Sequence, residues 1–469
     1  MKTWLAPIAI ILLAGCVRFH PHPISAERAA DAFQSRSLSS PGLEEFLAAN
    51  HVDTNAPAWD LNALTLVAFY YHPALAEMRA QWAAARAAII TAGQRPNPSV
   101  SVTPGYDSGI PGNFSPWLVP LSLDVPVETS GKRGKRMAQA AHLAEAARWN
   151  LVGAVWQARS RVRGALLELY AARETESLLA RQTSAQSNVV RLLEGQFAAG
   201  SVSSFEVTQA RVALETTQLA LQDAIGRRRQ ARVQLANALG LPLSALDDVR
   251  PSFAGLDQFP RELTQPEIQR QALLNRADVR GALAEYAASQ AALQLEIANQ
   301  YPDLHLGPGY AWNNGNAGDS QWSLGLTVTL PVLNHNQGPV AEAEAKRTQA
   351  AAHFVSVQAA AIGEISSALA GYNAALKKSA TARALLDNLR KQLDSVHAQE
   401  QAGEMAPLAV ASAEVEFDTG TQNRLDALVK AQQSLGQLED AVQSPLTLPA
   451  ESVRAAQTNS LLSPHFMSP

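Results

Sequence analysis

The chain contains 469 residues, carries a formal net charge of −4 and has a single cysteine. This near balance of charge gives no indication of nucleic-acid binding, and one cysteine excludes both a disulfide framework and a thiolate metal cluster. Aromatic residues make up only 6% of the chain while alanine occurs in long runs, which favours close-packed helices over a large globular core.

Residues 1–16 are typical of a bacterial lipoprotein signal. A lysine precedes an apolar run at 4–13, which is too short to span a bilayer because a spanning helix needs ~20 residues. The sequence LAGC at 13–16 then resembles the lipoprotein cleavage box, with Cys16 as the lipid attachment residue. Val17 follows, not the aspartate that retains lipoproteins in the inner membrane, so we expect the outer membrane. The alternative is a chance cysteine in a plain signal peptide.

A duplication organises the rest of the chain. The stretch PSVSVTPGY at 98–106 is answered by PDLHLGPGY at 302–310, and each copy predicts a helix, two strands and a long helical hairpin. The predicted divisions are a signal peptide (1–15), a lipidated extended arm (16–59), a first repeat (60–240), a connector (241–264), a second repeat (265–443) and a tail (444–469) expected to be largely disordered. We expect strands at about 98–107, 117–126, 302–312 and 321–331, and hairpin tips at about 198–204 and 401–407.

The predicted strands alternate between apolar and small polar residues. Trp322, Leu324, Leu326 and Val328 fall on one face, with Ser, Gly and Thr between them. Each run has the ~9–11 residues of a transmembrane barrel strand, in which lipid-facing and lumen-facing residues alternate. A strand of a soluble sandwich would show the same alternation, so this pattern alone does not decide between them.

Four such strands cannot close a barrel, because the smallest outer-membrane barrels have eight. Open strand edges are not viable in hydrocarbon, so several chains must share one barrel, and three chains would give twelve strands. The predicted fold is therefore mainly α with a small β portion: a trimeric 12-stranded barrel continued by an α-helical barrel in the periplasm. Such an object is a hollow conduit.

The order of these features resembles the TolC-like outer-membrane efflux factors over about residues 60–443. The resemblance also covers the strand ends VPV at 125–127 and LPV at 330–332, and the turn FAAGSVS at 197–203. It implies a homotrimer that meets a periplasmic adaptor and an inner-membrane pump of the resistance–nodulation–division (RND) type. The stretch PVETSGKRGKR at 126–136 resembles the branch for heavy-metal (cobalt–zinc–cadmium type) pumps, which implies export of metal cations.

Three alternatives remain open. A duct of this class also serves multidrug efflux or type I protein secretion. A lipid-anchored coiled-coil scaffold without a pore would explain the helices but not the strands. A periplasmic hydrolase needs a convergent acid, base or nucleophile set, and the sequence offers none, so we expect no enzyme activity, no cofactor and no resident metal.

Three groups of candidate functional residues follow. The hairpin tips are expected to meet the adaptor, acidic residues near the second tip to line the entrance, and a basic cluster to lie at the inner leaflet, either on lipid headgroups or as a solvated helix start. The tip residues are Gly200, Ser201, Val202, Ser203, Gly403, Glu404, Met405 and Pro407. The acidic residues are Glu400, Glu404, Glu414, Glu416 and Asp418, and the basic ones are Lys132, Arg133, Lys135 and Arg136. His305, between two apolar strand positions, is interpreted as a wet pore residue, with a metal ligand as the weaker alternative.

Overall fold

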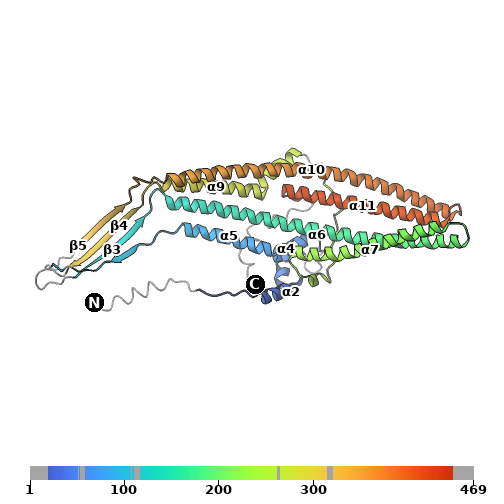
Figure 1. Cartoon of the computed structure of the whole chain (residues 1–469), viewed down its shortest axis with the longest axis horizontal. Helices are drawn as coiled ribbons and strands as arrows, with labels where there is room; N and C mark the ends of the chain where they lie inside the picture. Colours follow the sequence, from blue (N-terminus) through green and yellow to red (C-terminus); the bar gives the residue numbers. More distant parts are fainter. Residues whose placement is uncertain are drawn as a thin grey trace.

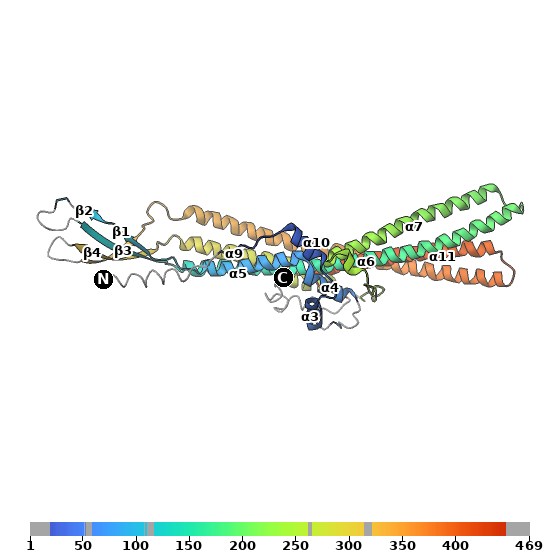
Figure 2. The same ribbon diagram turned by 90° about the horizontal axis from the view of Figure 1, so that it is seen from below.

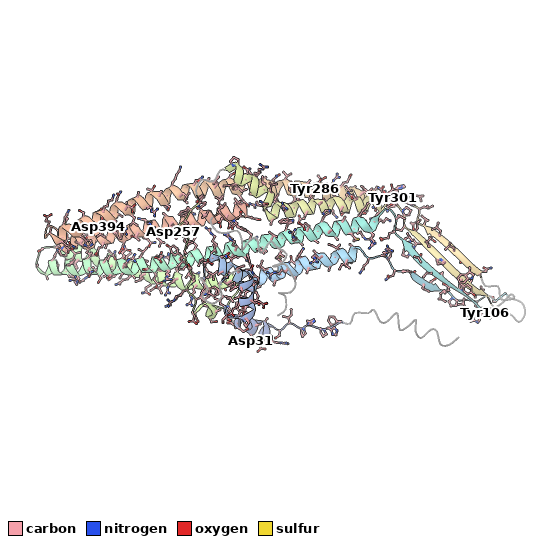
Figure 3. The ribbon with its side chains drawn as sticks, turned by 180° about the vertical axis from the view of Figure 1, so that it is seen from behind. Asp31, Tyr106, Asp257, Tyr286, Tyr301 and Asp394 are labelled. Carbon is pink, nitrogen blue, oxygen red and sulfur yellow. The ribbon has the colours of Figure 1, made fainter. Side chains whose placement is uncertain are left out.

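The computed structural model describes residues 19–50, 52, 59–106, 108–109, 117–260, 265–313 and 321–446. The molecule is elongated: a small sheet lies at one end, and long helices run from it to two hairpin tips at the other (Figure 1). With side chains drawn, Tyr106 lies at the sheet end and Asp394 near the opposite end (Figure 3).

The N-terminal arm contains two short helices, so the expectation of an extended arm is wrong for this part. They are α2 (Ala26–Gln34) and α3 (Pro41–Ala49). Each begins at a serine that accepts a backbone hydrogen bond, and α3 has proline in its first turn, where no N–H is needed. Leu43, Phe46 and Leu47 of α3 are buried. A serine cap thus starts both helices, and Pro41 adds a fixed φ at the start of α3.

Each repeat begins with a helix that is broken once. Strands follow, and the repeat ends in a long helical hairpin. The helices of the first repeat are α4 (Leu61–Tyr71), α5 (Pro73–Ala92), α6 (Lys132–Ala198) and α7 (Ser204–Leu239), followed by the 3₁₀ helix η1 (Leu243–Leu246). Those of the second are α8 (Gln265–Asn275), α9 (Ala277–Ala298), α10 (Gln337–Gln401) and α11 (Pro407–Val442). The 67 residues of α6 give it a length of ~100 Å at ~1.5 Å per residue.

The strands of both repeats form one antiparallel sheet in the order β1-β3-β4-β5, with the short β2 also paired to β3. Their bounds are β1 (Ser99–Val102), β2 (Gly105–Tyr106), β3 (Trp117–Val127), β4 (Leu304–Asn313) and β5 (Gln321–Val328). The strand expected at 98–107 is interrupted at Thr103 and Pro104, because proline has no N–H for the ladder. Contact between β3 and β4 joins the two repeats.

The long helices lie side by side in a single layer. Helix α6 packs against α5 and α7 on one side and against α9 and α11 on the other, and α10 lies beyond α9 and α11 (Figure 1). Seen from below, α7 leans away from α10 and α11 toward its tip (Figure 2). The edges of this layer are therefore α5 and α7 on one side and α10 on the other.

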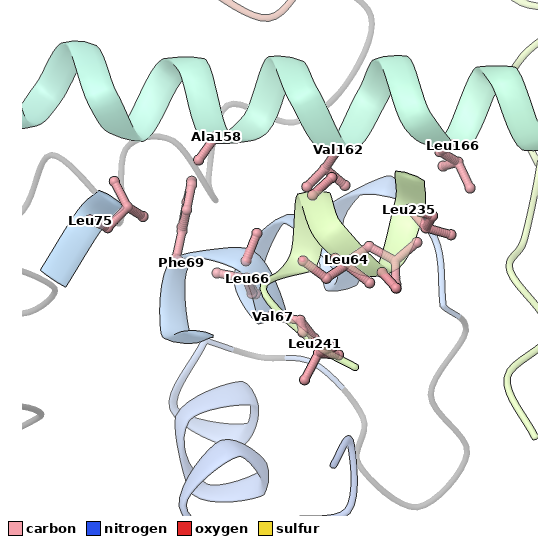
Figure 4. Packing of buried hydrophobic residues seen from close by; sticks show 14 of the residues in the cluster. Leu64, Leu66, Val67, Phe69, Leu75, Ala158, Val162, Leu166, Leu235 and Leu241 are labelled. Atoms are coloured by element: carbon pink, nitrogen blue, oxygen red, sulfur yellow. The ribbon is translucent and has the colours of Figure 1, made fainter. Parts of the chain in front are cut away.

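The main core lies at mid-length, where the broken helix meets the hairpin. Leu64 and Phe69 of α4 pack with Val162 of α6, Leu235 of α7 and Leu241 beyond it (Figure 4). A smaller cluster at the equivalent place in the second repeat joins α8, α10 and α11 around Tyr372. Both cores hold the helix breaks in place.

Candidate functional site

The sheet has one apolar face and one small, polar face. The apolar side chains of β5 are open to the surroundings of the single chain, with Trp322 82%, Leu324 78% and Leu326 62% exposed. The opposite face carries Ser101 and Ser122, whose hydroxyls lie 2.9 Å apart across β1 and β3. Transmembrane barrel strands have this division between a lipid-facing and a water-facing side.

Two aromatic pairs stand at the loop end of the sheet. The rings of Tyr106 and Trp117 have centroids 5.2 Å apart, and those of Tyr310 and Trp322 are 4.7 Å apart. Such pairs favour the membrane–water interface, where an amphipathic ring has one apolar and one wet side. The alternation of the strand predicts Trp322 on the apolar face, but it does not reveal either ring pair, although both tyrosines end the duplicated stretch.

His305 and Asp124 meet on the small, polar face. They are diagonal neighbours on β4 and β3, because His305 lies opposite Pro126 in the ladder. The His305 Nδ1 atom is 3.1 Å from both carboxylate oxygens of Asp124. The expected pore-facing position of His305 therefore brings a fixed carboxylate partner, which the spacing of either strand did not reveal.

The predicted basic cluster lies where β3 passes into α6, and internal contacts occupy three of its members. Lys132 is buried and donates to the Asp303 carboxylate at 2.8 Å. Arg133 donates to the carbonyl of Gly93 at 2.5 Å, and Arg136 makes a two-point contact with Glu128. Lys135 has no ion pair within the described residues. This junction therefore has a strong structural role, and contact with headgroups stays a prediction.

The two hairpin tips have the same backbone turn. Gly200 and Gly403 both have φ of +75°, a left-handed conformation that glycine adopts without steric strain. The residues after them match in burial: Ser201 and Glu404 are exposed, and Val202 and Met405 are half-buried. Pro407 begins α11 as its first residue, as expected from its fixed φ.

The tips differ in their polar contacts. At the first tip, Ser203 and Glu206 form a reciprocal capping box, and Arg211 bridges across the hairpin to Glu194. At the second, the cap residue Ala406 provides no side-chain hydrogen bond. His397 lies there with its two ring nitrogens 4.0 Å from Glu400 and Glu414.

The five predicted acidic residues do not form one group. Glu404 is exposed at the turn, Glu400 and Glu414 flank His397, and Glu416 accepts a hydrogen bond from Gln392 at 3.0 Å. Asp418 is 9% exposed and lies between α11 and α6, where Arg181 approaches to 3.9 Å. Burial raises the pKa of the Asp418 carboxyl. Asp418 thus belongs to the seam between the two hairpins.

That seam contains a buried ionic network near mid-length. The Glu439 carboxylate of α11 is 1% exposed and accepts from Arg159 of α6 at 3.0 Å, with Arg163 at 3.6 Å. Arg163 also donates to the carbonyl and the side-chain oxygen of Gln432, each at 3.0 Å. A neighbouring carboxylate, Asp440, accepts from the indole N–H of Trp156 at 2.9 Å. These contacts fix the two hairpins relative to each other.

An arginine also secures each helix break, but the two arginines come from different places. Arg276, at the break between α8 and α9, is buried and donates to the carbonyl of Ala441 at the end of α11 at 2.6 Å. In the first repeat the break residue is His72, and Arg36 of the N-terminal arm donates instead, to the carbonyl of Gly240 at 2.8 Å. The arm is thus joined to the end of α7.

Two further expectations concern a lipid anchor and a resident metal ion. Cys16, the predicted lipid attachment residue, lies outside the described residues. Across the part of the chain that the structure describes, no group of three or more His, Cys, Asp or Glu side chains is placed to hold a metal ion.

Comparison with known proteins shows which family has this architecture. The sequence profile of the family described as "Outer membrane efflux protein" matches residues 68–241 and 268–442, which correspond to the two repeats. The chain is 28% identical to the cobalt-zinc-cadmium resistance protein CzcC of Cupriavidus metallidurans over 220 residues, which cover 46% of the chain and 50% of CzcC. The alignment thus spans half the length of that relative.

Two further matches extend along most of the chain. It is 25% identical to the pyoverdine export outer membrane protein OpmQ of Pseudomonas aeruginosa over 466 residues, covering 93% of the chain and 92% of OpmQ. Its fold is similar to that of CusC, with a TM-score of 0.65 and 19% identity over 81% of the chain and 91% of CusC; that structure is described in connection with transmembrane channel formation.

Proposed function

The chain belongs to the outer membrane efflux protein family, and from this membership we propose that it is the passive outer-membrane duct of a tripartite efflux system for heavy-metal cations. As a member of that family it is a TolC-like channel of the Gram-negative outer membrane and not an enzyme. The trimer, the partners and the cargo are the proposal.

The observation that carries the proposal is the pair of open edges. Among the residues that the structure describes, strands β1 and β5 each pair on one side only. In hydrocarbon, every backbone N–H and C=O needs a partner within the protein. Pairing β5 of one protomer with β1 of the next supplies those partners and closes a ring, and three protomers give the twelve-stranded barrel.

The edges of the helical layer support the same assembly. Helix α10 includes an 18-residue stretch that is apolar enough to cross a membrane, yet only 17% of it is buried within the chain. At the other edge, α7 exposes Phe205, Val212 and Leu219 at intervals of one heptad. Packing α10 of one protomer against α5 and α7 of the next would cover both apolar surfaces and extend the ring as an α-helical barrel.

The other parts of the proposal rest on the family and its relatives. A passive duct needs an energy source elsewhere, so the partners are a periplasmic adaptor, which meets the hairpin tips, and an inner-membrane pump of the RND type. Similarity to a cobalt-zinc-cadmium resistance protein favours metal cations as cargo. The second candidate is export of an organic molecule, favoured by the near full-length match to a pyoverdine exporter. Acylation at Cys16 would add a lipid anchor.

Growth of a deletion strain tests the cargo. We expect the strain to be sensitive to zinc, cobalt or cadmium and the gene on a plasmid to restore resistance. Sensitivity only to antibiotics or other organic compounds would favour the second candidate. The same strain carrying Cys16→Ala tests the anchor, through loss of palmitate labelling.

Purified protein tests the duct. The expected result is a trimer that conducts ions in planar bilayers. A monomer without conductance would instead support a lipid-anchored scaffold and contradict the proposal.

A further inference from the structure

His305 and Asp124 form a side-chain contact on the open surface of the sheet. Backbone pairs between β3 and β4 lie on both sides of it, at Ser122 and at Val125, while the register skips Leu123 and Asp124. Both side chains are open, His305 at 39% and Asp124 at 48% of the side chain. Other residues on this face are mostly Ser, Gly and Thr. An imidazole oriented by a carboxylate on such a surface therefore calls for a chemical explanation.

The geometry fixes which ring nitrogen is available. With both oxygens of Asp124 at 3.1 Å from Nδ1, the favoured tautomer carries its proton on Nδ1 and donates it to the carboxylate. The lone pair is then on Nε2, which has no hydrogen-bond partner within the described residues. Histidines that bind transition metals commonly have this arrangement, in which a carboxylate orients the ring and raises its basicity.

The surroundings leave room for a hydrated cation. Across β4 and β5, Gly307 faces Gly325, and His305 faces Thr327. The three atoms nearest to a side chain built at Gly307 are backbone atoms at 3.6–3.9 Å, so a small side chain would fit at this position without a close contact. Asp124 supplies a negative charge beside the open space.

We propose that His305, oriented by Asp124, is a weak binding station for divalent transition-metal cations on the inner wall of the barrel. This rests on the proposed duct, because only ring closure makes the small, polar face a lumen. Imidazole nitrogen favours zinc, cobalt, nickel and copper over magnesium and calcium, which prefer oxygen. One imidazole nitrogen and one nearby carboxylate bind a metal cation weakly, as is needed for an exported ion that must be released again. In a trimer, threefold symmetry places three such stations in the wall.

Ion conductance of the purified full-length protein in planar bilayers tests this station. Zinc or cobalt chloride, added to potassium chloride, is expected to reduce the wild-type conductance at lower concentration than magnesium chloride does. In His305→Gln we expect the half-blocking zinc concentration to rise about tenfold while the magnesium value stays unchanged. Asp124→Asn should raise the half-blocking concentrations of both zinc and magnesium, because the Asp124 carboxylate attracts any divalent cation and the variant lacks its charge.

The matched control is His353→Gln, since His353 is an exposed histidine on α10, away from the sheet. It should leave all blocking concentrations at their wild-type values. If His305→Gln assembles poorly, His305→Thr provides the same measurement with the residue type found opposite it. A conducting channel whose zinc block does not depend on His305 would overturn the station and leave the duct intact. Absence of any conductance would overturn both.

Discussion

The two repeats have the same backbone plan but are held together differently. Both hairpins turn at a left-handed glycine, Gly200 or Gly403. The first tip has a full capping box at Ser203 and Glu206, whereas the second has none. At the second tip His397 approaches its two glutamates loosely, at 4.0 Å, and Gln399 donates to the Ser395 hydroxyl at 3.4 Å.

At mid-length it is the second repeat that has the stronger polar contacts. The second repeat secures its helix break with its own Arg276. The first uses Arg36 from the N-terminal arm together with Arg79 of α5, which donates to the carbonyl of Phe69 in the last turn of α4 at 3.0 Å. Both breaks need a cation at the carbonyl end of a helix, where the helix dipole is negative. Both repeats therefore have helix-end carbonyls that need a hydrogen-bond donor. The arginine that donates to them lies at a different sequence position in each repeat.

The largest effect is expected where the two hairpins are joined. Glu439→Ala leaves Arg159 and Arg163 buried without their carboxylate, which should destabilise the protein by about 3–5 kcal/mol. Thermal unfolding of the solubilised protein measures this. Glu168→Gln, at an exposed position of α6, is the control. Equal melting temperatures for both variants would show that the network does not hold the hairpins.

Equivalent strand positions test whether the repeats face the membrane alike. Leu121 of β3 and Leu326 of β5 both lie on the apolar face. Arginine at either position should destabilise the inserted barrel by about 2–4 kcal/mol, because it faces hydrocarbon. Thr327→Arg, on the polar face, should insert normally. Folding into lipid vesicles measures all three, and a defect in Thr327→Arg alone would reverse the assignment of the faces.

The helix breaks should differ in their dependence on their arginines. Arg276→Ala removes a buried side chain that also pairs with Asp278 and Glu364, so we expect a loss of about 2–3 kcal/mol. Arg36→Ala should lose about 1–2 kcal/mol, since Arg36 donates only to uncharged carbonyls, besides lying over the rings of Phe33 and Tyr71. Chemical denaturation compares the two. An equal or greater loss in Arg36→Ala would mean that the arm carries more of the fold than its contacts indicate.

The two tips differ in helix capping, and this difference can be removed by a substitution at either tip. Ser203→Ala removes the first cap at a cost of about 1 kcal/mol, and Ala406→Ser introduces a cap residue at the second tip with a gain of similar size. Hydrogen exchange at the first turns of α7 and α11 reads both changes. Unaltered protection in each variant would show that side-chain capping does not set the mobility of the tips.

The smallest effect concerns pH. Since burial raises the pKa of Asp418 in the folded state, the unfolded state releases this proton at lower pH. Asp418 therefore destabilises the fold increasingly as the pH rises above about 3.9. Asp418→Asn should match the wild type below that pH and exceed its stability at pH 7, by less than about 1 kcal/mol because Arg181 offsets part of the burial. Chemical denaturation of both proteins between pH 3 and pH 7 measures this, and equal free energies of unfolding at pH 7 would contradict it.

Much of the plan follows from the sequence, because the signals are local. Alternation at 322–328 predicts the strand β5, and the proline after His72 predicts the break between α4 and α5. The glycines at 200 and 403 predict the turns. The short helices of the arm were missed, since the prolines that suggest an extended chain are equally compatible with a first helical turn.

The sequence by itself therefore determined the duplication, which is visible as a repeated pattern of residues. It also determined the long hairpins, the two-faced strands and the tips, since each of these depends on neighbours within a few residues. Only the tertiary structure decided that Asp124 meets His305, that Glu439 meets two arginines, and that Asp418 lies in the seam rather than on a free surface. The physical reason is that these contacts depend on which strand and which helix of the first repeat lie beside those of the second. Local periodicity does not specify that choice.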